Sequence, residues 1–253
     1  MDPLRISDFE SAGVKLTAAT DADFDARAQT ILDGKATPLL ELKPYLAIVQ
    51  NENARTVVAY AVAWTTVQRN GSSETSYGQF KFPDAVAGTN NGLSLLAGRE
   101  IRTGEERLVG MGFEAWPADH VHAYRDFGLA EAHRLTNVKS VQVALDAVIL
   151  DDGAMLGPDQ SRLAEHFIEY VHAKQSLYRD IVVGLENGRA DVFAPLRSMV
   201  SAPVGAPPHG RRLDNYSRLA AEEILRFQDR VALEVFRRTL RREPFSIRRP
   251  SGK

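Results

Sequence analysis

The chain has 253 residues, of which 44% are apolar and 25% are charged, and its formal net charge is -2. A chain of this length and composition can bury a real core in one large or two modest domains, so overall disorder is excluded. It contains no cysteine, which excludes disulfides, thiolate metal sites and cysteine nucleophiles.

The sequence favours neither export nor membrane insertion. The longest apolar segment, residues 57–67, is interrupted by threonines and is far shorter than the roughly 18 residues of a membrane span. Asp2, Asp8 and Glu10 occupy the region where a signal peptide carries positive charge. We therefore expect no export signal and take the cytoplasm as the default compartment.

Residues 1–41 are expected to form an N-terminal extension with one short helix. Residues 14–18 fit a short strand. Thr20 followed by Asp23 resembles a capping box that begins a helix, and Gly34 would end that helix.

Residues 42–156 have the pattern of a β-domain. Five segments are rich in strand-forming residues and are separated by turn residues, namely 44–50, 55–68, 76–82, 106–113 and 138–150. In the second segment Tyr60 and Trp64 belong to a bulky face that alternates with alanines, which suits a central strand with the indole between two sheets. Asp152-Gly153 is typical of a type I′ hairpin. We predict an antiparallel, immunoglobulin-like β-sandwich.

Residues 157–253 change to the 3.6-residue period of helices. Asp159 fits an N-cap. Seven apolar residues after it share one helical face, namely Leu163, Phe167, Tyr170, Val171, Leu177, Tyr178 and Ile181. We expect this face to dock on the sandwich or on the last helix.

The remainder of this region predicts two more helices around a linker. Residues 192–200 fit a short helix interrupted at Pro195, and residues 202–210 form a Pro/Gly-rich linker. Residues 215–242 fit a long helix that Pro244 would end. Its apolar stripe includes Ala220, Ile224, Phe227, Val231 and Val235.

Four carboxylates near the end of the β-domain form the first candidate site. They are Asp146, Asp151, Asp152 and Asp159. Clustered carboxylates suit a hard cation such as calcium, but the spacing differs from that of an EF-hand loop, and Asp-Gly turns and Asp N-caps are ordinary structural features. Asp146 lies in mid-strand between apolar residues, where we expect its side chain to face solvent.

His120 and His122 form the second candidate site, because an extended segment would place both imidazoles on one face. Asp126 and His133 follow at longer spacing. A cupin uses such a histidine pair to hold a transition metal, but the glycine spacing of that motif is missing here. An unliganded pair is the commonest outcome for surface histidines, and metal binding is the alternative.

Two further groupings have ordinary structural interpretations. Glu165, Glu169 and His172 share one helical face opposite the apolar stripe, where a solvated surface is expected rather than a di-iron site. A triad of Ser161, Ser198 and His209 can be written down, but no local motif supports it. Nucleophile-elbow, Walker, dinucleotide-binding and zinc-protease motifs are all absent from the sequence.

Charge is unevenly distributed along the chain. Residues 211–253 hold 12 basic against 6 acidic residues, a net of +6, so residues 1–210 hold 19 against 27, a net of -8. The basic tail includes Arg237, Arg238, Arg241, Arg242, Arg248 and Arg249. Such a tail could bind nucleic acid or another anionic surface, but the acidic remainder would repel phosphate, and salt-bridged helix packing is the simpler reading.

Several segments carry a resemblance to other proteins. They are residues 42–51, 57–64 and 145–153 together with Gly157-Pro158-Asp159. The chain resembles, over most of residues 38–181, a group of uncharacterised bacterial proteins that join a strand-rich domain to C-terminal helices. The resemblance implies this architecture and carries no functional residue and no activity.

Three hypotheses of function remain open at this point. The first is a non-catalytic module that binds another protein or a second copy of the chain, because the β-rich core carries no chemical motif. The second is a metal-dependent enzyme or sugar-binding protein that uses the carboxylates or the histidine pair. The third is an anion-binding or nucleic-acid-binding protein that acts through its arginine-rich C-terminus. No catalytic, cofactor-binding or metal-binding residue is assigned, and no cofactor is expected.

Overall fold

A computed structural model describes residues 5–7, 13–83, 86, 99–115, 124–126, 129–130, 138–202, 212–226, 228 and 245–249. The chain divides into two compact units. The first, the β-unit, contains Met1–Phe80, Ile101–Leu163 and Arg249–Lys253. The second, the helical unit, contains Lys81–Glu100 and Ala164–Arg248. The three regions expected from the sequence, residues 1–41, 42–156 and 157–253, stay predictions.

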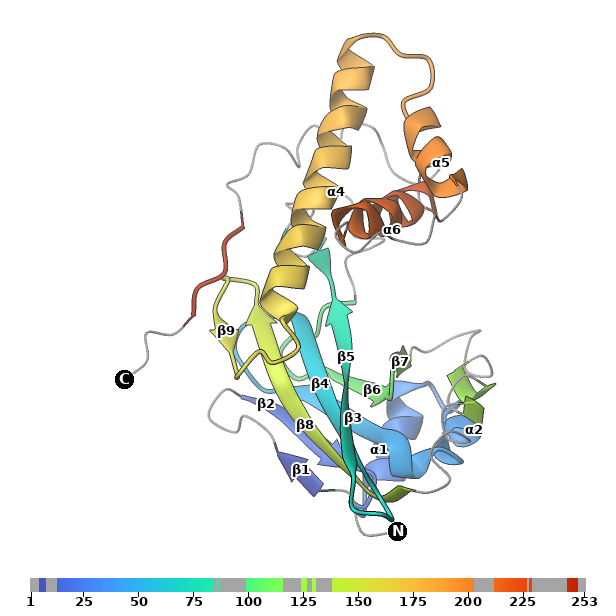
Figure 1. The fold of residues 1–253 in the computed structure, drawn as a ribbon, viewed down its shortest axis with the longest axis vertical. Helices are drawn as coiled ribbons and strands as arrows, with labels where there is room; N and C mark the ends of the chain where they lie inside the picture. Colours follow the sequence, from blue (N-terminus) through green and yellow to red (C-terminus); the bar gives the residue numbers. More distant parts are fainter. Residues whose placement is uncertain are drawn as a thin grey trace. The chain divides into compact units, whose positions relative to one another are not determined.

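The β-unit contains two sheets (Figure 1). Sheet A has the strand order β1-β8-β4-β5, with β9 also paired to β8, and comprises β1 (Arg5–Ser7), β4 (Val57–Gln68), β5 (Ser73–Lys81), β8 (Val138–Leu150) and β9 (Met155–Leu156). Sheet B has the order β2-β3-β6-β7 and comprises β2 (Val14–Ala18), β3 (Leu46–Asn51), β6 (Glu106–Gly110) and β7 (Phe113–Ala115). β1 runs parallel to β8, whereas β4 and β8 are antiparallel.

The two sheets pack face to face. The side chains alternate between the two faces of each strand, and one face of sheet A contacts sheet B. Tyr60 of β4 reaches Glu114 of β7 with its hydroxyl group, so its face of sheet A looks toward sheet B. Trp64 lies on the same strand face and is 1% exposed, in agreement with its predicted place between two sheets. The prediction of a β-rich domain followed by helices is therefore confirmed, whereas the strand order does not confirm an immunoglobulin-like topology.

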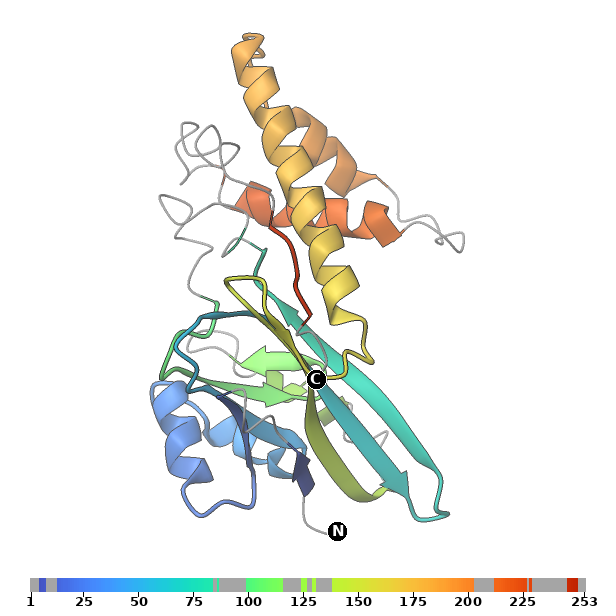
Figure 2. The ribbon, with the colours of Figure 1, turned by 90° about the vertical axis from the view of Figure 1, so that its left-hand side faces the viewer.

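Two helices cover the other face of sheet B, α1 (Phe24–Ile31) and α2 (Thr37–Leu40), with a 3-10 turn at Lys43–Tyr45 (Figure 2). Their core residues include Phe24, Leu32 and Leu39, which pack with Ile48 and Leu108 of the sheet. The predicted helix before Gly34 is confirmed as α1, and α2 is an addition that the sequence reading missed. Asp23 occupies the N-cap position without a side-chain capping bond, so the capping box predicted to begin at Thr20 is wrong.

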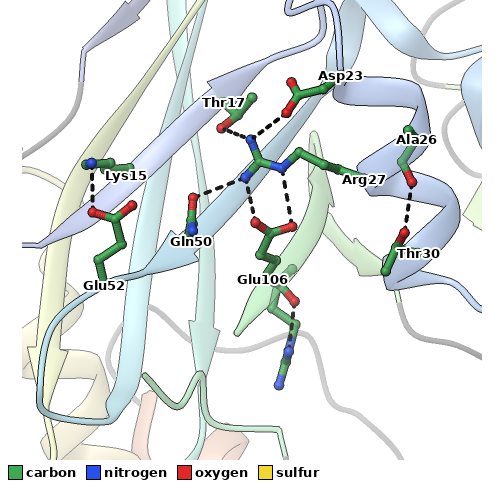
Figure 3. Close-up of polar contacts among 10 residues, drawn as sticks. Lys15, Thr17, Asp23, Ala26, Arg27, Thr30, Gln50, Glu52 and Glu106 are labelled. Carbon is green, nitrogen blue, oxygen red and sulfur yellow. Dashed lines mark hydrogen bonds and ion pairs between the residues drawn. The ribbon is translucent and has the colours of Figure 1, made fainter. Parts of the chain in front are cut away.

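Arg27 anchors α1 to sheet B through a planar network of acceptors (Figure 3). Its Nη2 lies 2.7 Å from Glu106 Oε1 and donates to Gln50 Oε1 at 3.1 Å. Its Nη1 donates to Thr17 Oγ1 at 2.9 Å and lies 3.9 Å from a carboxylate oxygen of Asp23. The guanidinium group therefore ties one helix to three strands of sheet B.

Two predicted turns in the β-unit have a different geometry. The segment predicted as one strand over residues 106–113 turns at Met111-Gly112 into β6 and β7, with Gly112 at φ 83°. The β8–β9 hairpin is not type I′, because only Gly153 has a positive φ, at 84°. The Gly153 N–H donates to the Leu150 carbonyl oxygen and the Leu150 N–H to Ala154, which is the pattern of a type I turn followed by a glycine bulge.

The helical unit contains α4 (Leu163–Glu186), α5 (Ala194–Ser201) and α6 (Arg212–Arg226). All seven residues of the predicted apolar face of α4 are buried. Tyr170, Tyr178 and Ile181 pack in one core with Ala220 and Ile224 of α6, so this face docks on the last helix. The predicted stripe of the last helix is confirmed at these two positions, and its continuation beyond residue 226 lies outside the described residues, as do residues 203–210 of the predicted linker.

Two helix ends differ from the sequence prediction. Pro195 lies in the first turn of α5 and so begins this helix instead of interrupting it, because the first turn needs no N–H from proline. Asp159 is not an N-cap, since α4 begins four residues later and Asp159 itself has φ 57°.

Candidate functional site

The candidate carboxylate Asp146 lies at a β-bulge in β8. Ala61 pairs with Ala147 and Val62 pairs with Leu145, which leaves Asp146 as the extra residue. A bulge breaks the side-chain alternation and redirects the side chain. Asp146 is 3% exposed, so the expected solvent-facing position is wrong.

The Asp146 carboxylate holds the segment that precedes α4. Its Oδ1 accepts the Gln160 N–H at 2.9 Å and its Oδ2 accepts the Ser161 N–H at 2.8 Å. The carbonyl oxygen of Asp146 accepts the Asp159 N–H at 3.2 Å. Two backbone donors satisfy the charge that burial would otherwise penalise. The geometry assigns this carboxylate to anchoring a loop.

The other members of the predicted carboxylate group have separate environments. Asp159 is buried, and a carboxylate oxygen lies 3.2 Å from Nη2 of Arg249. Asp152 accepts the Ala154 N–H at 2.9 Å within its turn, and Asp151 is exposed. In the part of the chain that the structure describes, no three histidine or acidic side chains are grouped as metal ligands.

The remaining candidates are scattered. His120, His122, His133 and His209 lie outside the described residues, and Asp126 is exposed. Ser161 belongs to the β-unit and Ser198 to the helical unit. Of the basic tail, Arg248 and Arg249 are described, and Arg249 pairs with Asp159 instead of presenting a free charge.

The face of α4 that was expected to be solvated is only partly so. Glu165 and His172 are exposed. Glu169 is half-buried, and its Oε2 is buried without a hydrogen-bond partner among the described groups. The spacing of these three residues therefore places them near one another on the helix without building a common site.

Tyr60 and Glu114 form a buried polar pair between the two sheets. The Tyr60 hydroxyl group donates to Glu114 Oε1 at 2.5 Å, and the Tyr60 ring lies 4.9 Å from that of Phe80. Burial first, and then the charge and the hydrogen bond of Glu114, raise the pKa of Tyr60 well above its ordinary value, while Arg107 acts in the opposite direction. The phenol is therefore held in its neutral, donating form.

The edge strand β5 presents a continuous run of exposed residues. Among the described strands β5 is the last on its side of sheet A, and the five consecutive residues Ser73–Tyr77 are all exposed. At the hairpin end, the Gln68 N–H donates to the Ser72 carbonyl oxygen. Because backbone groups alternate in direction along an antiparallel strand, Ser73, Thr75 and Tyr77 direct their N–H and C=O groups away from β4.

A cluster of titratable and aromatic side chains surrounds Tyr216 of α6 in the helical unit. The Tyr216 hydroxyl group lies 2.7 Å from His166 Nδ1, and its ring stacks on Tyr170 with 5.4 Å between the centroids. Lys81 Nζ lies 5.5 Å from the centroid of the Tyr216 ring. Burial lowers the pKa of Lys81 to about 8. We name Lys81, His166, Tyr170 and Tyr216 the tyrosine cluster.

An ion pair between a buried lysine and a partly exposed glutamate adjoins the tyrosine cluster. Lys174 of α4 is 0% exposed, and its Nζ lies 2.6 Å from Glu223 Oε2 and 5.8 Å from the centroid of the Tyr170 ring. Lys174 lies at helical spacing within the apolar stripe of α4, so a charged residue on a buried face was a signal that the sequence reading passed over. No local pattern marks Lys81, because its partners lie on distant helices.

Comparison with protein-family models, curated proteins and solved structures gives no match. The resemblance to strand-rich bacterial proteins with C-terminal helices, expected from the sequence, therefore stays a prediction. No helix in the described ranges combines the length and the apolar character needed to cross a bilayer.

Proposed function

We propose that the chain is a non-catalytic interaction module whose edge strand β5 pairs with an extended segment of a partner protein. The observation that carries the proposal is the run of five exposed residues at Ser73–Tyr77 on the outer edge of sheet A. Backbone N–H and C=O groups on an open edge form a template for another strand.

The composition of this edge supports pairing. Natural edge strands are commonly protected by proline, by a bulge or by several charges. Residues 73–77 read Ser-Glu-Thr-Ser-Tyr, with one charge and no proline. One cross-strand hydroxyl pair already forms between β4 and β5, where the Oγ1 atoms of Thr65 and Thr75 lie 2.8 Å apart.

The side chains of the edge indicate the chemistry of the partner. Thr75 and Tyr77 share one face of β5, and the Tyr77 ring is held by a hydrogen bond of 3.1 Å from its hydroxyl group to Gln160 Oε1. Hydroxyl and aromatic residues opposite these two would add favourable cross-strand pairs. The same proposal includes an immunoglobulin-like domain that binds its partner through the edge of the sandwich. The face-to-face packing of the two sheets supports this part of the proposal.

The variant Thr75→Pro tests this proposal. Proline removes the outward N–H of residue 75 and leaves the hydrogen bonds to β4 in place, because edge strands tolerate proline at such positions. Thr75→Val is the matched control, since it loses the same hydroxyl group but keeps the N–H. We expect the wild type and Thr75→Val to retain a common partner from native lysate and Thr75→Pro to lose it.

Hydrogen exchange on the isolated complex locates the contact. Protection of the Ser73, Thr75 and Tyr77 amides on binding supports the proposal. Equal retention by Thr75→Pro, or protection confined to the helical unit, would overturn it. Sedimentation of the purified chain shows whether the partner is a second copy of the chain or a different protein. If the chain pairs with itself, its oligomeric state depends on protein concentration.

A further inference from the structure

The tyrosine cluster contains an amine beside a coupled phenol and imidazole, which the interaction proposal does not use. Lys81 Nζ faces the Tyr216 ring, and the Tyr216 hydroxyl group is hydrogen-bonded to His166. All three residues belong to the helical unit. The Lys81 side chain is partly exposed, so a small reagent can reach it.

Burial changes the chemistry of this amine. A lysine whose pKa is about 8 is about one-quarter neutral at pH 7.5, whereas an ordinary exposed lysine is neutral at a level of about 0.1%. The neutral amine is the nucleophile, and desolvation is a common way to activate a lysine. A weakly charged lysine is a poor clamp for anions, which favours covalent chemistry at this position over anion binding.

The neighbours of Lys81 suit the two proton transfers of imine formation. A phenol can donate a proton to the oxygen of the attacked carbonyl group, which leaves as water. An imidazole that is hydrogen-bonded to the phenol can then return a proton to the phenol. The face of the Tyr216 ring also stabilises a cation at Nζ, and a protonated imine keeps its positive charge there. Among the described residues, the adjoining charges of Lys174 and Glu223 form an ion pair and so offset each other.

We propose that Lys81 forms reversible imines with small aldehydes or ketones, with Tyr216 and His166 as the proton-transfer pair. The Nζ lone pair attacks the carbonyl carbon, so a C–N bond forms as the C=O π bond breaks, and one amine proton moves to the oxygen to give a carbinolamine. The carbinolamine oxygen takes a second proton from the Tyr216–His166 pair, and water leaves as the C–O bond breaks and the nitrogen lone pair forms the C=N bond of a protonated imine. The two protons of that water come from the amine and the pair, and reprotonation of the pair from solvent completes the balance.

The experiment traps the imine in the full-length protein. Acetaldehyde with cyanoborohydride reduces each imine to a stable ethylamine, and peptide mass spectrometry gives the rate at every lysine. The exposed Lys35 and Lys139 serve as controls within the same molecule. At pH 7.5 we expect Lys81 to react on the order of 10-fold faster than these controls, with a half-maximal rate near pH 8. A rate equal to or below the controls, or a midpoint above about pH 10, would overturn the proposal.

The variant Tyr216→Phe separates proton transfer from packing. Phenylalanine keeps the ring over Lys81 and removes the hydroxyl group. We expect the maximal rate at Lys81 to fall several-fold with the midpoint near pH 8 retained, while the rates at Lys35 and Lys139 stay constant. An unchanged rate at Lys81 would overturn the role assigned to the Tyr216–His166 pair. His166→Gln provides a second variant should Tyr216→Phe lose its helical circular dichroism.

Discussion

Individual residues in the β-unit show how a buried charge is accommodated. Asp146 is almost fully buried and has both carboxylate oxygens satisfied by backbone N–H groups. Its neighbour Asp151 is exposed, and its own N–H donates to the Thr56 carbonyl oxygen. Sequence inspection placed both residues in one candidate group and expected Asp146 to face solvent, because the bulge that turns its side chain inward has no sequence signal of its own.

The variant Asp146→Asn is expected to lower the free energy of unfolding by about 1–3 kcal/mol. An asparagine offers one acceptor oxygen, and its NH2 group would then face a backbone N–H. Asp151→Asn is the control and should change stability by less than about 0.5 kcal/mol. Urea titration followed by tryptophan fluorescence measures both. A similar small loss in the two variants would show that the Asp146 bonds are not needed for the loop.

At the scale of elements, the predicted strands are confirmed best where periodicity is long. β4 and β8 run over Val57–Gln68 and Val138–Leu150, close to the predicted 55–68 and equal to the predicted 138–150. Shorter pieces such as β1 and α2 were missed, since three or four residues carry too little periodicity to be recognised. Their placement depends on partners elsewhere in the chain.

The anchoring of α1 gives a prediction at this scale. Arg27→Lys should lower the free energy of unfolding by about 1–2 kcal/mol, because lysine cannot reproduce the planar fork that binds Glu106, Gln50 and Thr17 together. Arg55→Lys is the control. The Arg55 side chain is 58% exposed and its Nε lies 3.8 Å from Asp152 Oδ2, so this surface ion pair contributes little to stability. Faster amide exchange confined to α1 is the expected signature. Equal losses in the two variants would contradict the anchoring role.

At the scale of the whole molecule, the shifted pKa values of Lys81 and Tyr60 predict opposite changes in the free energy of unfolding as the pH rises. The pKa of Lys81 is lowered by burial to about 8 from 10.5, so the unfolded chain binds this proton more tightly and stability rises between pH 8 and 10.5. The pKa of Tyr60 is raised, chiefly by burial. Its contribution to the free energy of unfolding is therefore complete below pH 10 and is lost as the pH rises further.

Variants at these two positions show how much each group contributes to the change of unfolding free energy with pH. The stability difference between the wild type and Lys81→Met should rise by about 1–3 kcal/mol from pH 8 to 10.5, after allowance for solvent screening at a partly exposed group. The difference between the wild type and Tyr60→Phe should decrease above pH 10. Urea unfolding at each pH measures both differences. Differences that stay constant with pH would show that the two groups titrate normally.

The sequence by itself determined the β-rich region, the later helices and the buried face of α4, because each depends on a periodicity that local residue order carries. It also excluded cysteine chemistry. Only the tertiary structure decided which charged residues lie inside. The bulge at Asp146, the pairing of buried Lys174 with Glu223, and the meeting of Lys81 with Tyr216 and His166 join residues from different elements. Such contacts depend on the path of the chain between elements, and no local period records that path.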